Sequence, residues 1–319
     1  MSLVTVCIAT FNRAALLSRS VESVRAQTHK DLQIIIVDDA SSDETSSVAQ
    51  TYAATDSRIT CLRHNENHGL GAARNTAIQH AAGKYFTFID DDDQWESSVI
   101  EKFVAVAEHY DSNWCFCCGY ISKTRGRPIR YDFPKQESSL KAFIAAGWTP
   151  PVAGQFYSTD TVRRVCGYNE RISSGVDHDL WLKLAVVDIN IRTVQGCYAL
   201  PDVSVMPEKA TTNEERRRRD LEKSLIEWRE LIETSFGREF YRHFIDCYQY
   251  YLSRKFFVLH AKRGNIAGVC KSILISPSKI WLIRSAIGSL IDRMNRSDRR
   301  TLTPVFMPFD ARRFESRTD

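Results

Sequence analysis

Short apolar runs alternate with helical stretches over residues 4–89 of the chain. Four runs predict strands: Val4–Ala9, Leu32–Val37, Ile59–Arg63 and Tyr85–Ile89. The stretches between them predict helices over Ala14–Ala26, Asp43–Ala54 and Gly71–Ala82. Strands that alternate with helices in this way build a mostly parallel sheet flanked by helices. The pattern therefore predicts an α/β fold of the Rossmann-like kind.

Polar residues stand where three of these predicted strands end, at Thr10–Arg13, Asp38–Ser42 and Asp90–Asp93. In open α/β sheets, ligands bind beyond the carboxyl ends of the strands. The convergence of three polar segments at that edge predicts a functional site there.

The pattern is less regular further along the chain. Trp114–Ile121 predicts a strand, Lys123–Lys135 a basic loop, Asp177–Val187 a helix and Ile191–Val205 an irregular strand. After Thr212 the spacing becomes helical, with one apolar face made by Leu221, Leu225, Trp228 and Ile232, and Ser276-Pro277 predicts the start of a last helix. We therefore expect three regions: 1–108, 109–212 and a helical C-terminal region, 213–319.

Composition narrows the class of protein. With 43% apolar and 26% charged residues, the 319-residue chain is typical of globular proteins. Met1 is followed by an apolar run without a basic segment, which predicts no secretory signal, and no stretch approaches the roughly 20 apolar residues of a membrane span. Nine cysteines without zinc-finger spacing predict reduced thiols and a cytoplasmic location.

Charge is distributed unevenly. Residues 214–319 hold 22 Lys and Arg against 14 Asp and Glu, whereas the preceding part is net acidic. Within residues 254–300 there are 11 basic residues and only 2 acidic ones, interleaved with apolar side chains. This composition suits peripheral contact with an anionic membrane, and the alternative is a helical region that packs on the catalytic body with a solvated basic rim. No motif supports nucleic-acid binding.

Four consecutive aspartates, Asp90–Asp93, follow the fourth predicted strand. Adjacent carboxylates repel one another unless a cation lies among them, and oxygen ligands suit Mg²⁺ or Mn²⁺. The alternative is a solvated turn, because Asp is favoured at helix caps. Asp38-Asp39 is a second acidic pair, which could accept hydrogen bonds from a base or ribose or could form an Asx turn.

Two further segments carry candidate chemistry. Gly69–Asn75 has glycines before a helix and Arg74 in its first turns, where the side chain could reach a phosphate or lie on the surface. Asp177 and Asp179 open a predicted helix, so one could be its N-cap and the other a general base in a cleft. His178, between them, could be a base, a metal ligand or an exposed side chain.

Five motifs occur in the order typical of one enzyme family: Thr10–Arg13, Asp38-Asp39, Gly71–Asn75, Asp90–Trp95 and Asp177–Trp181. Over residues 3–184 the chain resembles a family 2 glycosyltransferase with the GT-A fold, of the inverting, bacterial surface-polysaccharide type. The resemblance implies an enzyme that moves a sugar from a nucleotide diphosphate sugar, such as a UDP-hexose or UDP-N-acetylhexosamine, to a hydroxyl of a lipid-linked saccharide acceptor. It also implies a divalent cation, Mn²⁺ or Mg²⁺.

The resemblance further implies a role for each motif residue. Thr10, Phe11, Asn12 and Arg13 would line the nucleotide pocket in region 1–108, Asp39 would bond the base, and Arg74 would lie near the base and diphosphate. Asp90, Asp91 and Asp92 would form the DxD motif, with Asp92 and Asp90 on the metal and Asp93 near the sugar hydroxyls. In region 109–212, Asp177 would be the catalytic base. Candidate acceptor contacts are Trp95, Trp148, His178, Asp179 and Trp181.

Two departures from the family pattern keep alternatives open. Val176 stands where many relatives have Glu, and Met206–Thr212 lacks a common His, although Lys209 could neutralise the diphosphate instead. A non-catalytic nucleotide-sugar-binding scaffold is one alternative. A nucleotidyltransferase is the other, but it would be expected to have a Gly-rich loop in place of Thr10–Arg13.

Overall fold

The computed structural model describes residues 2–124, 127–133, 135–145, 154–200, 214–262, 264–276 and 299–301. The chain divides into two compact units, which we describe separately. The first unit takes its residues from 1–141, 150–204 and 299–302, and the second from 142–149, 205–298 and 303–319.

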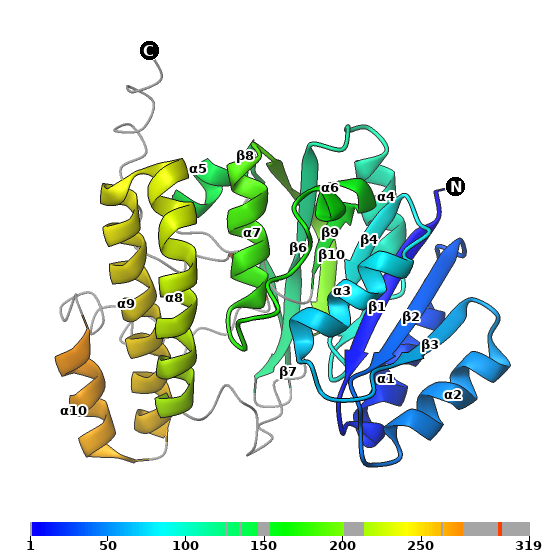
Figure 1. Ribbon diagram of the computed structural model, residues 1–319, viewed down its shortest axis with the longest axis horizontal. Coiled ribbons are helices and arrows are strands. Elements are labelled where there is room, and N and C mark those ends of the chain that lie inside the picture. The colour runs from blue at the N-terminus through cyan, green and yellow to red at the C-terminus, as the bar shows by residue number, and fades with distance from the viewer. Residues whose placement is uncertain are drawn as a thin grey trace. The chain divides into compact units, whose positions relative to one another are not determined.

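All seven elements predicted over residues 4–89 are present in the first unit (Figure 1). Four strands pair in parallel in the order β4-β1-β2-β3, and a helix follows each of the first three. The strands are β1 (Val4–Thr10), β2 (Leu32–Asp38), β3 (Ile59–Arg63) and β4 (Tyr85–Phe88); the helices are α1 (Ala14–Arg25), α2 (Thr45–Thr55) and α3 (Leu70–His80). The predicted fold class is confirmed.

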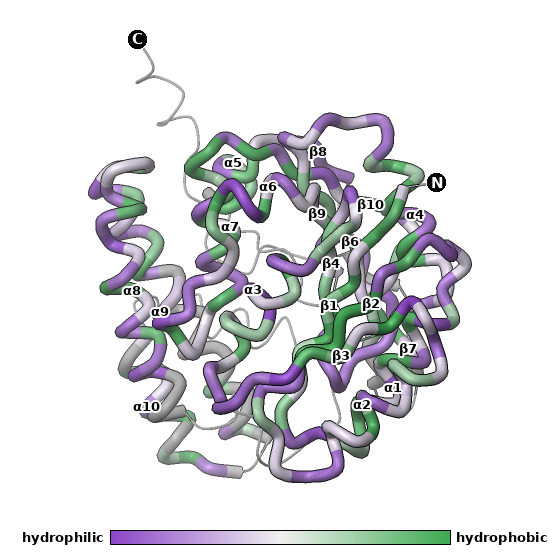
Figure 2. Tube along the Cα trace, turned by 45° about the vertical axis from the view of Figure 1, so that its right-hand side comes forward, coloured by the Kyte–Doolittle hydropathy of each residue, from purple (hydrophilic) through white to green (hydrophobic). Residues whose placement is uncertain are grey.

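The two faces of β1 have different neighbours because successive side chains of a strand point to opposite sides. Val4, Val6 and Ile8 are fully buried in an apolar cluster that also holds Leu17 and Val21 of α1. Figure 2 shows β1 and β2 as a strongly apolar centre of this unit. Cys7 points to the other face, where burial raises the pKa of its thiol to about 12. That second face also receives α3, which brings Arg74 close to the end of β4.

The rest of the first unit extends the sheet with strands of both directions. The remaining elements are β5 (Gln94–Trp95), α4 (Val99–Ala107), β6 (Trp114–Thr124), β7 (Arg127–Asp132), β8 (Glu137–Ser139), α5 (Leu140–Ala145, whose last residues belong to the second unit), β9 (Gln155–Ser158), α6 (Thr159–Arg164), α7 (Val176–Val186), β10 (Asn190–Leu200) and β11 (Arg299–Thr301). The main path of the sheet is β11-β7-β6-β9-β4-β1-β2-β3, with β9 antiparallel to both β4 and β6. The sheet is therefore parallel in its N-terminal half and mixed beyond it.

The prediction of a basic loop over Lys123–Lys135 is wrong. β6 and β7 form an antiparallel hairpin that covers most of this stretch, with Ile121 opposite Arg130. Within β7, Ile129 is buried between exposed Pro128 and Arg130. This period-two pattern is that of a half-buried strand, and the high charge of the segment hides it. The irregular strand predicted over Ile191–Val205 is confirmed as β10, whose register shifts between Val194 and Tyr198; residues 201–205 lie outside the described part.

The described part of the second unit contains three complete helices, α8 (Glu214–Phe236), α9 (Arg238–Lys262) and α10 (Ile266–Ile275). The predicted apolar face of α8 is buried, and Trp228 contacts the rings of Phe244 and Tyr248 on α9. Gly237, with φ +87°, makes the turn between the two helices. The helix predicted from Ser276-Pro277 falls on residues that the structure does not describe beyond Ser276.

Two further observations concern the cysteines and the apolar character of the helices. The cysteines whose side chains are described are free thiols, and five of them, Cys7, Cys115, Cys117, Cys118 and Cys197, are buried. Within the described ranges, no helix is both long enough and apolar enough to span a bilayer.

Candidate active site

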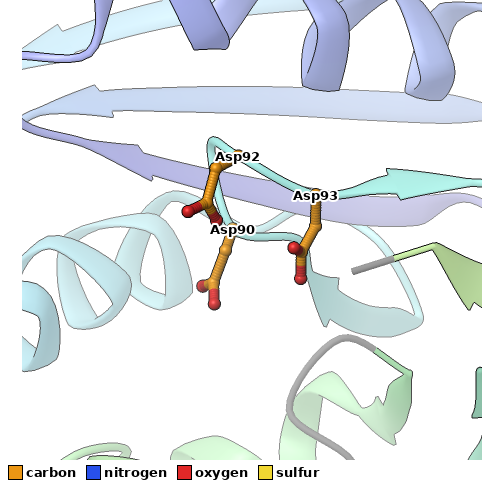
Figure 3. Close-up of side chains that lie close together, drawn as sticks. All are labelled: Asp90, Asp92 and Asp93. Carbon is orange, nitrogen blue, oxygen red and sulfur yellow. The ribbon is translucent and has the colours of Figure 1, made fainter. Parts of the chain in front are cut away.

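The four aspartates form a turn, the acid loop (Asp90–Asp93), between β4 and β5. The Asp93 N–H donates to the Asp90 carbonyl at 3.0 Å, and the Ser20 hydroxyl of α1 donates to the same carbonyl at 3.1 Å. The turn directs three carboxylates to one side (Figure 3), and one carboxylate oxygen from each of Asp90, Asp92 and Asp93 lies within 4.8 Å of the other two. The acid loop is thus fixed at its backbone, and its carboxylates converge.

These three carboxylates have the chemistry of a divalent-cation site. Hard oxygen ligands suit Mg²⁺ and Mn²⁺, and three negative charges this close are costly without a cation. The sequence-based metal ligands Asp90 and Asp92 are both in the group. Asp93, expected only as a sugar contact, joins them as a possible ligand.

Asp91 is turned away from the other three. Its side chain is buried and accepts a hydrogen bond from the Thr10 hydroxyl at 2.7 Å. Burial raises the pKa of Asp91 to about 7, although the Thr10 hydrogen bond and the Arg13 charge act in the opposite direction. Asp91 therefore connects the acid loop to the end of β1 and takes no part in the carboxylate cluster.

Asp177 lies in the first turn of α7. The helix begins at Val176 after Gly175, whose left-handed φ of +77° turns the chain into the helix. The expectation that Asp177 or Asp179 is the N-cap is therefore wrong, because Gly175 holds that position and has no side chain to cap the helix. Burial raises the pKa of Asp177, whereas the Arg74 charge lowers it. Val176, at which the resemblance implied a Glu, is buried and offers no polar group.

Arg74 joins the acid loop to α7. Its guanidinium donates to Asp177 Oδ1 at 2.7 Å and to Asp90 Oδ1 at 2.8 Å. The side chain is only 1% exposed, and its Cζ lies 3.7 Å from the centroid of the Phe88 ring and 5.2 Å from that of Tyr168. Burial alone would lower the pKa of Arg74, but Asp177, Tyr168 and Asp90 hold it above its usual range. A guanidinium in this position is permanently charged and orients both carboxylates.

Phe88 and Tyr168, which hold Arg74, were missed by sequence reasoning. Phe88 is the residue that ends β4, two positions before Asp90, so its place beside the acid loop was readable from the strand boundary. Tyr168 comes from the turn between α6 and α7, where the Asn75 side chain of α3 bonds its backbone N–H and carbonyl. No local sequence pattern predicts this long-range contact between Tyr168 and Arg74.

The remaining polar side chains of α7 have partners inside the protein. Asp179, 2% exposed, pairs with Lys183 at 2.7 Å, and the Trp181 indole N–H donates to Gln155 Oε1 at 2.9 Å. His178 packs against the Trp181 ring at 4.7 Å. Trp181 and Trp95 are predicted above as acceptor contacts, but both are buried in the core, which favours core packing for them. Trp148 and Lys209 lie outside the described residues.

The predicted nucleotide end of the site gathers at the carboxyl ends of β1 and β2. Asn12, with φ +53°, accepts a hydrogen bond from the Ser42 N–H at 2.7 Å, which ties the two strand ends together. Phe11 is 43% exposed beside it. Arg13 reaches Asp92 at 3.5 Å and so connects this end to the acid loop.

Asp38 and Asp39 make different contacts. Asp38 is fully buried and pairs with Arg63. Its carboxylate also accepts a hydrogen bond from the Ser41 N–H at 2.9 Å, as expected for an Asx turn. Asp39 accepts from the backbone N–H groups of His68 and Gly69 at 2.9 and 2.7 Å. Nδ1 of the His64 ring lies 2.7 Å from Oδ1 of Asp39. Asp39 thus holds the segment that leads into α3 against the end of β2.

Comparison with known proteins identifies the family to which the chain belongs. The model of glycosyl transferase family 2 matches residues 5–164. The chain is 32% identical over 194 residues to a Campylobacter jejuni GalNAc(5)-diNAcBac-PP-undecaprenol beta-1,3-glucosyltransferase, which covers 58% of this chain and 60% of the relative. It is 36% identical over 123 residues to the Escherichia coli UDP-Glc:alpha-D-GlcNAc-diphosphoundecaprenol beta-1,3-glucosyltransferase WfaP, covering 39% and 48%. The match thus spans about half to three fifths of these relatives.

Solved structures share the fold at low sequence identity. The chain resembles S. aureus TarS 1-349 in complex with UDP-GlcNAc with a TM-score of 0.61 and 17% identity, over 86% of this chain and 82% of that one. It resembles the mannosyltransferase PcManGT of Pyrobaculum calidifontis, in complex with GDP-Man and Mn2+, with a TM-score of 0.56 and 16% identity, over 92% and 81%. These likenesses support the GT-A fold expected from the motif order.

Proposed function

The chain belongs to glycosyl transferase family 2, and from that premise we propose that it is a metal-dependent, inverting glycosyltransferase. It would transfer a sugar from a nucleotide diphosphate sugar to a hydroxyl of a saccharide acceptor. The observation that carries the proposal is the pair of hydrogen bonds through which Arg74 joins Asp90 to Asp177. A displacement at one carbon atom needs the donor site and the base for the acceptor hydroxyl close together. Asp90 is a candidate for the donor site and Asp177 for the base, and Arg74 joins them.

Asp90, Asp92 and Asp93 would hold the divalent cation, Mg²⁺ or Mn²⁺. When bound, such an ion neutralises the charge that develops on a leaving diphosphate. Arg13, 3.5 Å from Asp92, adds positive charge on the nucleotide side of the acid loop. Phe11, exposed at the end of β1, is the aromatic surface available to a base there.

Asp177 is proposed as the general base. It would accept the proton of the acceptor hydroxyl as that oxygen attacks the anomeric carbon on the face opposite the diphosphate. The new glycosidic bond forms while the bond from the carbon to the diphosphate oxygen breaks, so the configuration inverts. Burial raises the pKa of Asp177, which makes its carboxylate a stronger base than an exposed aspartate.

We assign Arg74 as a positioning residue for this base. The sequence led us to expect Arg74 near the base and diphosphate, but its guanidinium is buried and already shared between two carboxylates. Arg74 favours the ionised form of Asp177 and fixes the direction of Oδ1. Asp39 acts in a comparable way on the nucleotide side, because it holds His68 and Gly69 at the entrance to α3.

The donor and acceptor are proposed from the relatives and the motif order. A UDP-hexose or UDP-N-acetylhexosamine is the proposed donor, and a saccharide linked to undecaprenyl diphosphate the proposed acceptor, because both relatives described above are named for undecaprenol-linked acceptors. The product would belong to surface polysaccharide assembly. An acceptor of this kind resides in a membrane, so we propose peripheral contact with the inner face of the cytoplasmic membrane through the basic region 254–300.

The test is a panel of nucleotide sugars, each incubated with the protein and Mg²⁺, Mn²⁺ or EDTA, with release of the nucleotide as the readout. We expect slow, metal-dependent hydrolysis of at least one UDP-sugar, and faster release when an undecaprenyl-diphosphate saccharide is added. Binding of a donor without turnover under any of these conditions would identify a nucleotide-sugar-binding scaffold instead. No binding and no turnover with any donor would overturn the proposal.

A further inference from the structure

Two of the larger apolar side chains of α10, Ile266 and Leu274, lie on the outside of the helix, whereas Val269 and Ile273 are half-buried. Ile266 is 78% exposed and Leu274 is 72% exposed, whereas Ser272 is fully buried. A helix that only had to pack on its neighbour α9 would be expected to bury isoleucine and leucine and to expose serine. The hydrophobic pattern of α10 therefore indicates a second apolar contact on its outer face.

The exposed apolar residues form a continuous line. Ile266, exposed Cys270 and Leu274 are spaced four residues apart, which places them on one face along about 12 Å of the helix. Exposed Lys271 lies beside them. We call these four residues the α10 stripe. Figure 1 shows α10 in orange, at the end of the described helices of the second unit.

The charge of the surrounding sequence selects the kind of partner. No aspartate or glutamate occurs between residues 247 and 291, a run that carries seven Lys and Arg and includes the whole of α10. Apolar side chains flanked by basic ones, with acidic residues excluded, match a surface that is apolar inside and anionic at its boundary. A basic partner protein would be repelled by this run of positive charge.

A second exposed isoleucine shows what an ordinary surface position looks like. Ile226 on α8 is 73% exposed, but Glu222 and Glu230 stand one turn away on either side. An isolated apolar residue among charges needs no partner. It provides a control of equal exposure in the same unit.

We propose that the α10 stripe docks this protein on an anionic lipid surface, with Ile266 and Leu274 entering the boundary between headgroups and acyl chains and Lys271 remaining among the headgroups. The proposal deepens the membrane contact of the proposed function by assigning it to one helix face. It rests on the proposed function for the reason that the protein would contact a membrane. The way in which it would attach is inferred from α10 itself.

The experiment measures co-sedimentation of the full-length protein with vesicles of phosphatidylcholine and phosphatidylglycerol, and with vesicles of phosphatidylcholine alone. We expect binding to the anionic vesicles that weakens at about 1 M salt, where the Debye length falls to about 3 Å. The double variant Ile266→Asp/Leu274→Asp should bind at least about tenfold more weakly, since it replaces both inserting side chains by anions. Ile226→Asp should bind as the parent does.

Three results would overturn the proposal. The double variant could bind vesicles as tightly as the parent. It could lose thermal stability relative to Ile226→Asp without any change in vesicle binding, which would mean that another part of the chain covers the stripe. It could alter the molar mass measured by light scattering, which would make the stripe an interface between copies.

Hydrolysis of the nucleotide sugar in the absence of vesicles, measured on the same preparations, separates this proposal from the proposed function. Unchanged hydrolysis with parent-like vesicle binding by the double variant would remove the docking assignment and leave the enzyme. Weakened vesicle binding by the double variant, without hydrolysis by any preparation, would leave the docking assignment and remove the enzyme.

Discussion

The acid loop and the first turn of α7 both present aspartates to the same arginine, yet they are built for different charges. In the loop, three carboxylates share one side of a turn, and the side chains of Asp90 and Asp92 are 32% and 14% exposed. In α7, Asp177 is a single buried carboxylate paired with Arg74, and burial raises its pKa. Clustered and partly hydrated carboxylates suit a cation, whereas a single desolvated carboxylate suits a proton. The comparison teaches that the grouping and burial of aspartates, more than their number, separate a cation site from a base.

The sharpest test of this division is Asp177→Asn, for which we expect the largest loss. Removal of a general base lowers turnover by about 10²–10⁴-fold, while the acid loop keeps its ability to bind the donor and metal. Steady-state turnover and donor affinity, measured by calorimetry, check the two halves of the expectation. Asp179→Asn is the matched control, because Asp179 lies in the same turn of the helix but pairs with Lys183. Parent-like turnover by Asp177→Asn would end the assignment of the base.

Asp92→Asn tests the other side of the comparison and should have the next largest effect. Loss of one carboxylate from the cluster should weaken metal binding at least about tenfold and reduce turnover at a fixed metal concentration. The distinguishing result is partial recovery at high Mn²⁺, which Asp177→Asn cannot show. The control is Asp91→Asn, whose side chain points away from the cluster. Equal metal dependence in the Asp92 variant and the parent would contradict a cation site in the acid loop.

Arg74→Lys tests the link between the two regions, with a smaller expected loss. A lysine keeps the positive charge, but its compact ammonium cannot donate in fixed directions to two carboxylates as the guanidinium does. We expect kcat to fall about tenfold with little change in the KM for the donor, because the orientation of Asp177 is disturbed more than the acid loop. Arg74→Gln should lose far more and destabilise the fold by about 3–5 kcal/mol, since it leaves two carboxylates without their cation.

A residue that contacts only the diphosphate would behave differently. In that case Arg74→Lys would chiefly raise the KM for the donor and leave kcat near the parent value. Such a result would restore the role that the sequence first suggested and remove the positioning role proposed from the geometry.

The same contrast explains what could be predicted from the sequence. The parallel half of the sheet was readable because each of its strands is a local apolar run between helices of ordinary length, and the polar residues at the strand ends mark the site. The mixed half was not, because β9 is only four residues long and its position between β4 and β6 depends on long-range pairing. Lys123–Lys135 was misread because charge masked the alternation of β7.

Within the site, residue identities were predicted and their partners were not. Motif order identified Asp90, Asp92 and Asp177, but nothing local indicates that Arg74 bonds both ends or that Tyr168 packs beside it. Contacts separated by as many as 103 positions, such as that between Arg74 and Asp177, arise only when the helices dock on the sheet.

The smallest effect on turnover is expected for Asp91→Asn, which tests whether Asp91 has a different role from the three clustered aspartates of the acid loop. Asn keeps an oxygen that can accept the Thr10 hydrogen bond, so activity should stay within about threefold of the parent. Stability should respond instead. The folded pKa of Asp91 is raised from 3.8 to about 7, so the folded protein retains a proton that the unfolded chain releases, and stability falls as the pH rises through that window.

The substitution should remove that loss, because Asn does not titrate. We therefore expect the unfolding free energy of Asp91→Asn, relative to the parent, to increase by about 2–3 kcal/mol between pH 5 and pH 8. Urea unfolding in EDTA measures it without interference from metal. Parallel pH dependence in the two proteins would mean that folding does not raise the pKa of Asp91, and it would contradict the separation of a buried, protonated Asp91 from the charged carboxylates of the acid loop.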